Sequence, residues 1–523
     1  MSDPDFGTVD RPLISAFREG AARFPDAMLT VSSAQRAGTH RLADITAQGL
    51  RFAAGLRARG IGAGDIVAVQ LPAWAEWMIA CVGIAHSGAA MLPIVSIYGA
   101  KELGFILRQS GAKLLVTPDR WRSADYAQVL AACGDLPALG AHVVIGDAVP
   151  AGAVDWRDML LDPAATPPTA CDPDALAMLV YTSGTTADPK GVCHSSRSLL
   201  SELAAVAHAR RGIEEIILSP WPPGHVAGAC TMMRFLTQGR ALVLMDQWDP
   251  AEAAMLIERH RVSSASFTPF HLAGILDAAD CVGRDLSSLV NCLVGAAPVP
   301  PTLIERCAAR GLSTFRSYGS SEHPTVTTGY PDDPMHKRLT TEGRAMTGSR
   351  MRFVDDAGDD VPPGANGEIV TRGPELFTGY FDPSLNAAAM LPDGWYRTGD
   401  IGHLDRDGYL VISDRKKDII IRGGENISSR EVEDVLLADP MVQEAAVVAC
   451  PDARMGEIVC AFITPRPGAR VNLESVRAHF ADAGIARQKT PERVIIVDAL
   501  PRNTTGKVLK HELRARVRRD AGT

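Results

Sequence analysis

One stretch of the sequence has the residue types of a phosphate-binding loop. The run YTSGTTADPKGV, at positions 181–192, carries hydroxyl side chains, glycines and a lysine directly after the apolar run LAMLVY. Backbone N–H groups and hydroxyls at the end of a strand suit a polyanion. The run is not a Walker A loop, because Pro189 stands where that motif needs its second glycine and Gly191 follows Lys190 in place of Ser or Thr. Taken alone, it is equally compatible with an ordinary polar turn.

The sequence around this loop predicts a sheet with its helices. Strands are expected at 176–181, 241–245 and 289–294, and helices are expected to begin at Pro250, Pro269 and Pro301. Their alternation is typical of an α/β fold in which helices cover a largely parallel sheet. Ligands bind such sheets at the loops that leave the carboxyl ends of the strands.

The pattern changes twice in the second half of the chain. From about Gly348, short apolar runs and turn signals predict a β-rich subdomain without a helix. After residue 414, a helix at 429–437, strands at 445–448 and 458–463 and further alternation predict a small α+β domain. We therefore expect a large N-terminal domain, 1–414, and a C-terminal domain, 415–523.

Composition narrows the class of protein. The chain has 523 residues and a formal charge of −8, which argues against a nucleic-acid partner. Its ten cysteines show no CxxC pair and no zinc spacing, so we expect reduced, buried thiols. The first residues lack an apolar signal core, and the apolar region 74–95 is interrupted by Glu76 and Pro93, which excludes an integral membrane segment. A cytoplasmic protein fits these features.

Further motifs follow the opening run in a fixed order. They are VGAAP (294–298), SYGSSE (317–322), GYF (379–381), GWYRTGD (394–400), DRKKDIIIRGGENISSREVE (414–433) and PRNTTGKVLK (501–510). This series resembles the adenylate-forming superfamily of acyl-CoA synthetases, peptide-synthetase adenylation domains and beetle luciferases, and it spans nearly the whole chain. The resemblance implies that a carboxylate attacks the α-phosphate of ATP, which yields an acyl-adenylate and pyrophosphate.

The resemblance also implies which residues bind ATP, Mg²⁺ and coenzyme A. The residues expected at these cofactors are Thr182, Ser183, Gly184, Thr185, Thr186, Lys190, Gly295, Ala296, Ala297, Pro298, Tyr318, Gly319, Ser321, Asp400, Arg415, Gly423 and Gly424. The opening loop would hold the β and γ phosphates and Tyr318 the adenine face. Asp400 and Arg415 would hold the ribose hydroxyls, for which a carboxylate acceptor is suited. Glu322, with Thr182, is expected at Mg²⁺.

Lys507 is the residue expected to act in the first step. The resemblance places it at the carboxylate and the α-phosphate, where an ammonium about 4 Å away is worth roughly 4 kcal/mol at an effective dielectric near 20. Lys417 matches a hinge about which the C-terminal domain rotates, so that Gly423 and Gly424 approach the pantetheine arm of coenzyme A. The spacing in PRNTTGK also makes a lysine acetyltransferase a candidate partner that acts on Lys507.

The stretch PWPPGHVAG, at 220–228, lies where the family forms the wall of its acyl pocket. It has no Asp to pair with a substrate ammonium, so α-amino acids are poor candidates. His225 resembles a gate beside the substrate carboxylate, although a structural histidine stays an alternative. The expected pocket residues are His225, Val226, Gly228, Gly319 and His323. Short stretches of the sequence most resemble those of ligases whose substrates are medium-chain, cyclic or small aromatic acids.

Several functions remain open on this evidence. The leading prediction is an acyl-CoA synthetase that converts a carboxylic acid, ATP and coenzyme A into acyl-CoA, AMP and pyrophosphate. One alternative is an adenylating enzyme that loads a separate carrier protein. Another is a non-catalytic nucleotide-binding protein, which the presence of Lys507, Glu322 and Asp400 disfavours. No feature of the sequence specifically indicates a luciferase-type oxygenase, although the fold would allow one. The oligomeric state is not fixed, and a homodimer stays open.

Overall fold

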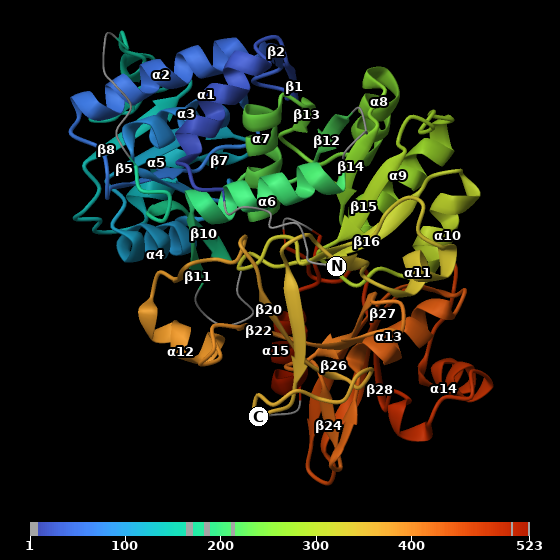
Figure 1. Ribbon diagram of the computed structural model, residues 1–523. Coiled ribbons are helices and arrows are strands. Elements are labelled where there is room, and N and C mark those ends of the chain that lie inside the picture. Colours follow the sequence, from blue (N-terminus) through green and yellow to red (C-terminus); the bar gives the residue numbers. More distant parts are fainter. Residues whose placement is uncertain (1–8, 164–170, 183–188, 211–214, 504–505, 521–523) are drawn as a thin grey trace.

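The larger part of the molecule is built on two mostly parallel sheets covered by helices (Figure 1). The computed structural model describes residues 9–163, 171–182, 189–210, 215–503 and 506–520. The first sheet contains β1 (Met28–Ser32), β2 (Gly38–Arg41), β12 (Ile216–Ser219), β13 (Ala241–Met245), β14 (Ser264–Phe267), β15 (Asn291–Gly295), β16 (Thr314–Tyr318), β17 (Thr327–Thr328) and β18 (Arg344–Ala345). The second contains β3 (Ile66–Val69), β4 (Ala90–Pro93), β5 (Leu114–Pro118), β8 (Ala141–Ile145), β9 (Val154–Asp155), β10 (Leu176–Thr182), β11 (Lys190–Ser195) and β21 (Gly379–Tyr380). A separate hairpin joins β6 (Arg120–Trp121) to β7 (Ala124–Asp125).

Helices cover both sheets. They are α1 (Leu13–Arg23), α2 (Leu42–Ala58), α3 (Ala75–Ser87), α4 (Ala100–Ser110), α5 (Tyr126–Ala131), η1 (Trp156–Met159), α6 (Ser196–Ala209), α7 (Val226–Gln238), α8 (Pro250–His260), α9 (Pro269–Val282), α10 (Pro301–Ala309) and α11 (Met335–Thr340). The strands expected near 176, 241 and 289 and the helices expected from Pro250, Pro269 and Pro301 are confirmed as β10, β13, β15, α8, α9 and α10. Their signals are local: Asp249 caps α8 by accepting from the Glu252 N–H at 2.8 Å.

The β-rich part is an antiparallel sheet of β19 (Arg350–Val354), β20 (Gly367–Arg372), β22 (Tyr396–Leu404) and β23 (Leu410–Arg415). The expectation that this part has no helix was wrong, because η2 (Pro383–Leu385) and α12 (Asn386–Ala389) lie within it. Alanine has the highest helix propensity, but a single turn is too short to show an apolar period.

The residues after Arg415 form their own sheet and core. The strands are β24 (Ile420–Arg422), β25 (Glu425–Ile427), β26 (Val442–Asp452), β27 (Gly456–Pro465) and β28 (Arg493–Ile496), and the helices are α13 (Ser429–Ala438), α14 (Leu473–Asp482), η3 (Arg487–Lys489) and α15 (Lys510–Asp520). The apolar faces of α13 and α14 bury Val432, Leu436, Val476 and Phe480 in one cluster with β26 and β27. This confirms the α+β pattern read from the sequence.

The structure also tests the expected burial of the cysteines and the expected lack of a membrane-spanning helix. All ten cysteines are free, but Cys281 is exposed and Cys171 and Cys193 are half-buried, so the expectation of uniformly buried thiols was wrong for these three. Within the described ranges, no helix combines the length and apolar character that crossing a membrane requires.

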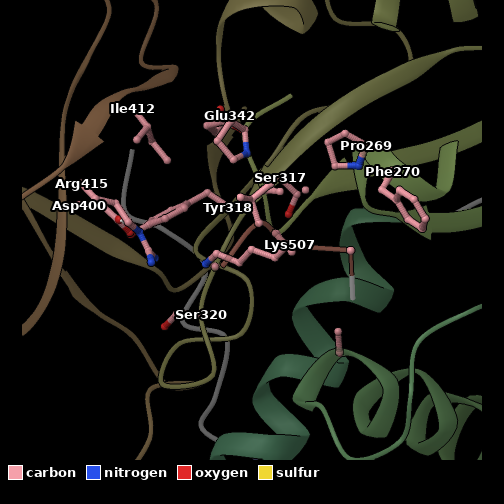
Figure 2. A pocket seen from close by; sticks show the side chains of 18 of the residues that line it. Pro269, Phe270, Ser317, Tyr318, Ser320, Glu342, Asp400, Ile412, Arg415 and Lys507 are labelled. Atoms are coloured by element: carbon pink, nitrogen blue, oxygen red, sulfur yellow. The ribbon is translucent and has the colours of Figure 1, made fainter. Parts of the chain in front are cut away.

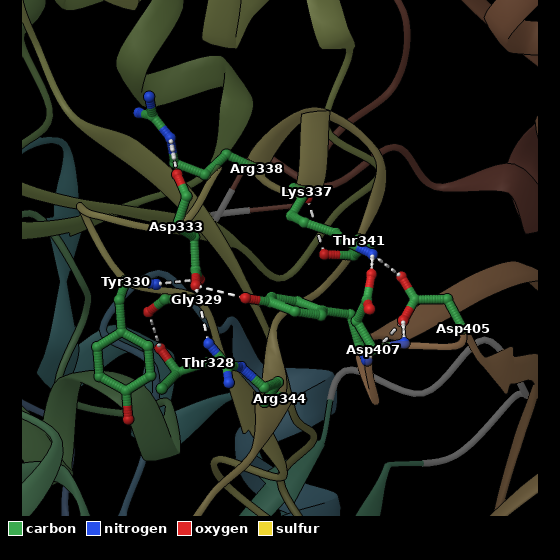
Figure 3. Close-up of polar contacts among 11 residues, drawn as sticks. Thr328, Gly329, Tyr330, Asp333, Lys337, Arg338, Thr341, Arg344, Asp405 and Asp407 are labelled. Carbon is green, nitrogen blue, oxygen red and sulfur yellow. Dashed lines mark hydrogen bonds and ion pairs between the residues drawn. The ribbon is translucent and has the colours of Figure 1, made fainter. Parts of the chain in front are cut away.

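A polar network joins the first sheet to the β-rich sheet (Figure 3). Asp333 accepts hydrogen bonds from the Tyr409 hydroxyl at 2.6 Å, the Tyr330 backbone N–H at 2.8 Å and Arg344 Nη2 at 3.3 Å. Beside it, Lys337 Nζ donates to Asp405 Oδ2 at 2.7 Å. Because Asp405 and Tyr409 flank the turn between β22 and β23, the network fixes this hairpin against the segment that runs from β17 through α11 to β18.

We expect Tyr409→Phe to lower the free energy of unfolding by about 1–2 kcal/mol, because buried Asp333 loses one donor. Urea unfolding measures this effect as a lower midpoint at unchanged slope. Tyr330→Phe is a matched control, since the Tyr330 hydroxyl points away from the network in Figure 3 and only its backbone N–H contacts Asp333. Equal midpoints for the two variants would show that the Tyr409 hydroxyl does not secure the hairpin.

Candidate active site

A cavity of about 1930 Å³ lies where the first sheet, the β-rich sheet and the C-terminal residues meet. Its wall includes Tyr318 from the end of β16, Asp400 and Arg415 from β22 and β23, and Lys507 from the turn before α15 (Figure 2). The carboxyl ends of the parallel strands β14, β15 and β16 therefore open into this cavity, as expected for a helix-covered parallel sheet.

A carboxylate links an aromatic ring to a guanidinium on one side of the cavity. Asp400 accepts from the Tyr318 hydroxyl through Oδ2 and from Arg415 Nε through Oδ1, both at 2.7 Å. Asp400 and Arg415 are cross-strand partners, so the pairing of β22 with β23 sets their separation. The charge of Asp400 raises the pKa of Arg415, and burial raises the pKa of Tyr318 well above its ordinary value. The carboxylate is rigidly held and keeps further acceptor capacity for hydroxyl donors.

Two tight turns border this group. In the first, Gly295 to Pro298 line the cavity, and Ala296 has a φ of +62°, in the left-handed region. In the second, a Cβ added to Gly319 would lie 1.9 Å from the Pro324 carbonyl oxygen, so only glycine fits there. The Nε2 of buried His194 hydrogen-bonds the Ser321 carbonyl oxygen at 2.8 Å, which secures the second turn from β11.

Glu322 is held by a tyrosine. It is buried, and its Oε1 accepts from the Tyr380 hydroxyl at 2.7 Å. Lys190 Nζ lies 5.2 Å from the centroid of the Tyr380 ring. In the part of the chain that the structure describes, no three His, Cys, Asp or Glu side chains are grouped as metal ligands. Magnesium is often bound by one or two carboxylates that share it with phosphate oxygens, so Glu322 fits a single protein ligand of this kind.

The run expected to bind phosphate is described at both of its ends. Thr182 and Lys190 are cross-strand partners at the ends of β10 and β11, and both line the cavity. Ser183, Gly184, Thr185 and Thr186 lie outside the described residues.

The turn that carries Lys507 docks on an aromatic side chain of the N-terminal part. A Cβ added to Gly506, whose φ is +78°, would lie 2.8 Å from Phe270 of α9. The guanidinium carbon of Arg502 lies 5.4 Å from the centroid of the same ring. Figure 2 shows the Lys507 side chain extending toward Tyr318 and Arg415. The contact with Phe270 thus brings an amine from the C-terminal part into the cavity.

The ammonium of Lys507 is destabilised in this position. The charge of Arg415 and the loss of solvent lower its pKa to about 7. Below that pH the side chain is cationic, and above it the neutral amine dominates. A polyanion bound nearby would raise the pKa again, because opposite charge favours the ammonium.

We expect an amine-acylating reagent to modify Lys507 at a rate that rises with pH, has its midpoint near pH 7 and levels off above that pH. Lys416 is the matched control, since the carboxylate of Asp356 raises its pKa above the ordinary lysine value. Peptide mass spectrometry over a pH series measures both rates. Equal midpoints for the two lysines would contradict the lowered pKa.

The expected acyl-pocket residues are only partly brought together. His225 and Val226, at the start of α7, line the cavity, as does Gly319, and burial lowers the pKa of His225 to about 4. Gly228 and His323 are not among the lining residues, which corrects the expectation for both.

Close packing explains each of these two corrections. A Cβ on Gly228 would lie 2.2 Å from the Pro222 carbonyl oxygen, so this glycine packs against the preceding turn. The fully buried His323 points back toward β20, where its Nδ1 lies 2.9 Å from Thr371 Oγ1 and its Nε2 lies 3.1 Å from Glu375 Oε1.

Gly423 and Gly424 form the turn between β24 and β25, away from the lining of the cavity, whereas Lys417 lines it. Several residues that line the cavity were not predicted from the sequence. Tyr380 and Tyr396 belong to the motifs GYF and GWYRTGD, whose buried aromatics were the available signal. Phe270 and Glu202 lie outside the motifs, and no pattern in the sequence marks them.

Comparison with known proteins agrees with the family that the sequence motifs resemble. The family model described as AMP-binding enzyme matches residues 17–381, and the model of the AMP-binding enzyme C-terminal domain matches residues 431–507. The chain is 34% identical to the medium-chain fatty-acid–CoA ligase of Escherichia coli (strain K12), over 98% of this chain and 91% of that protein. It is 36% identical to the 3-[(3aS,4S,7aS)-7a-methyl-1,5-dioxo-octahydro-1H-inden-4-yl]propanoyl:CoA ligase of Mycobacterium tuberculosis (strain ATCC 25618 / H37Rv), over 88% of this chain and 91% of that protein.

The fold agrees with a solved structure, that of the amide bond synthetase McbA from Marinactinospora thermotolerans. Its TM-score is 0.85 at 27% identity, and the match covers 96% of this chain and 99% of that one. The family models, the relatives of high coverage and the fold therefore agree, and the chain belongs to the AMP-binding enzymes of the adenylate-forming superfamily, in the acyl-CoA synthetase branch.

Proposed function

We propose that the protein is an AMP-forming acid:CoA ligase, which activates a carboxylic acid with ATP and transfers the acyl group to coenzyme A. The observation that carries the proposal is the convergence of Lys507, Glu322 and the Tyr318, Asp400 and Arg415 group on one cavity. A non-catalytic nucleotide-binding protein would have no need for a lysine held between these groups.

The residues divide the first step among them. Asp400 accepts the ribose hydroxyls and Tyr318 contacts the adenine, which orients the α-phosphate toward Lys507. As the substrate carboxylate attacks, its oxygen bonds to the α-phosphorus and the bond to pyrophosphate breaks. The Lys507 ammonium stabilises the charge that develops on the phosphoryl oxygens. Thr182 and Lys190 hold the departing phosphates. Glu322 would hold Mg²⁺, which when bound would neutralise phosphate charge.

The second step needs a different face of the C-terminal part. We place the domain boundary between residues 414 and 415, at the last residue of β23, with the hinge at Lys417. In the structure Lys507 faces the cavity and the turn of Gly423 and Gly424 does not, which is the arrangement suited to adenylation. Rotation would withdraw Lys507 and bring the glycine turn to the pantetheine arm, whose thiol then displaces AMP.

A medium-chain or ring-containing acid suits the cavity best. The relatives named above are a ligase of medium-chain fatty acids and a ligase of a bicyclic dioxo acid. Here, helices α6 and α7 contribute apolar lining residues such as Leu203, Val206 and Cys230. Apolar lining of this kind accepts an alkyl chain or a ring.

We expect Phe270→Ala to slow adenylate formation about tenfold, because the Lys507 turn loses the ring on which Gly506 and Arg502 rest. Conversion of supplied acyl-adenylate and coenzyme A into acyl-CoA should be unchanged, since Lys507 is withdrawn in that step. Phe270→Tyr keeps the ring and should retain the adenylation rate. A loss in both half-reactions would assign Phe270 a general structural role.

The modification proposed for Lys507 follows from the same chemistry. Acetylation by a lysine acetyltransferase would remove the ammonium and stop adenylation while sparing thioester formation. Enzyme acetylated at Lys507 that still adenylates at full rate would contradict this.

Oxygen-18 in the substrate carboxylate tests the reaction class directly. Attack of that carboxylate on the α-phosphorus transfers one labelled oxygen to AMP. Label that appears in AMP after turnover with coenzyme A supports the proposed reaction. Label that remains wholly in the acyl product or in inorganic phosphate would exclude it.

A further inference from the structure

A buried carboxyl group lies in the wall of the cavity that α6 and α7 form. Glu202, Leu203 and Val206 of α6 line the cavity, as do Cys230 and Thr231 of α7. Helices α6 and α7 lie side by side in Figure 1. Because α7 begins directly after His225, the proposed acyl site would extend along this wall.

The hydrogen bonding of this carboxyl is incomplete. The Glu202 side chain is only 3% exposed, and its Oε1 accepts from the Thr325 hydroxyl at 2.6 Å. Its Oε2 has no hydrogen-bond partner among the residues that the structure describes. Buried polar atoms in native proteins are nearly always paired, so an unpaired carboxyl oxygen beside a ligand cavity indicates a group supplied by the ligand.

The nearby cations do not satisfy Glu202. Arg234 Nη2 donates to Glu215 Oε2 at 2.6 Å, and Arg210 Nη1 lies 3.7 Å from Glu215 Oε1. Both guanidinium groups are thus directed to Glu215, whose side chain is fully buried. Burial raises the pKa of Glu202 to about 7, so the carboxyl can accept or donate a hydrogen bond near neutral pH.

We propose that Glu202, together with Thr325, forms a subsite for an oxygen substituent on the part of the acyl group remote from the reacting carboxylate. A hydroxyl group fits both protonation states, since it can donate to a carboxylate or accept from a carboxylic acid. An oxo group fits the neutral acid. A substrate with an ammonium group is disfavoured on grounds of charge. This wall already holds two guanidinium groups, and within the described part of the chain the carboxylate of Glu215 is the one partner that they share. The substrate class is therefore a hydroxy or oxo carboxylic acid, an inference that rests on the proposed function.

Matched sets of acids test this subsite. Each set shares one carbon skeleton and contains the plain acid, a hydroxy acid and an oxo acid, and kcat/KM is measured by ATP–pyrophosphate exchange. In at least one set we expect the wild-type enzyme to prefer a substituted acid about tenfold or more, since a site built to hydrogen-bond a substituent rejects the analogue that lacks it. The member preferred distinguishes a hydroxyl from an oxo ligand.

The variants separate the subsite from a structural role. Glu202→Leu should abolish the preference and leave the KM for ATP unchanged, whereas Glu202→Gln, which keeps polar atoms, should retain part of it. Glu19→Gln, at an exposed position of α1 outside the cavity, controls for loss of a glutamate. If Glu202→Leu does not fold, Thr325→Val provides the same comparison.

Two results would overturn the subsite: an unchanged preference in Glu202→Leu, or a wild-type preference for the plain acid in every set. Absence of exchange with every acid would instead sink the proposed function. Calorimetric binding of the same sets to the wild-type protein and Glu202→Leu then decides the subsite separately, and equal affinities for all members would refute it.

Discussion

Replacing Lys507 by methionine is expected to slow adenylate formation by about a thousandfold, the loss that corresponds to roughly 4 kcal/mol of transition-state stabilisation. Methionine keeps the length of the side chain but removes the charge beside the α-phosphate. Thioester formation from supplied acyl-adenylate and coenzyme A should stay within about twofold, because interactions made only in the first transition state affect only that step. Rapid quench of the two half-reactions measures both rates.

Lys489→Met is the matched control for this variant. Lys489 lies in the C-terminal part and pairs with Glu431 at 2.6 Å, outside the cavity. Its loss should leave both half-reactions unchanged, since exposed ion pairs contribute little. Equal losses in the two half-reactions of Lys507→Met would contradict the role of its ammonium in adenylation alone.

Replacing Asp400 by asparagine is expected to raise the KM for ATP by about 10- to 100-fold. Each oxygen of the Asp400 carboxylate accepts a charge-assisted hydrogen bond, one from Arg415 and one from Tyr318. An amide turns an NH₂ group toward one of these donors and leaves Arg415 without its counter-charge. The loss thus combines weaker ribose binding with a displaced guanidinium.

Asp356→Asn controls for the removal of an aspartate. Asp356 is 92% exposed and pairs with Lys416 at the surface, so its loss should not change the KM for ATP. Pyrophosphate exchange gives the KM, and calorimetry with AMP gives the affinity directly. An Asp400→Asn protein that keeps its melting temperature and its affinity for AMP would show that this carboxylate does not bind the ribose.

The features that the sequence predicts well depend on neighbouring residues. The helix from Pro250 follows from a capping Asp249 and a proline in the first turn, and the apolar run of β10 is complete within seven residues. Pairings between distant strands leave no such signal. Strands β1 and β2, from the first fifty residues, add to the sheet of β13, 200 residues later in the chain, which no local pattern indicates.

The site residues, too, divide into those that a local motif predicts and those that depend on contacts between distant segments. Asp400 and Arg415 were assigned through motif resemblance, and the register of β22 and β23 places them as partners. His323 was expected in the acyl pocket, but the turn directs its ring toward Glu375. Phe270 resembles any surface phenylalanine in the sequence, and only the approach of Gly506 reveals its role. Side-chain direction in an irregular turn depends on tertiary packing that a single sequence does not display.

The central claim is that one chain makes an acyl-adenylate and passes the acyl group to coenzyme A. The most direct test is release of AMP by the purified protein with ATP, Mg²⁺ and a panel of medium-chain and ring-containing acids, measured with and without coenzyme A. We expect at least one acid to support pyrophosphate exchange without coenzyme A and rapid, stoichiometric release of AMP and acyl-CoA with it. Exchange that coenzyme A does not convert into AMP release would contradict the claim and identify another acceptor, and absence of exchange with every acid would contradict adenylation itself.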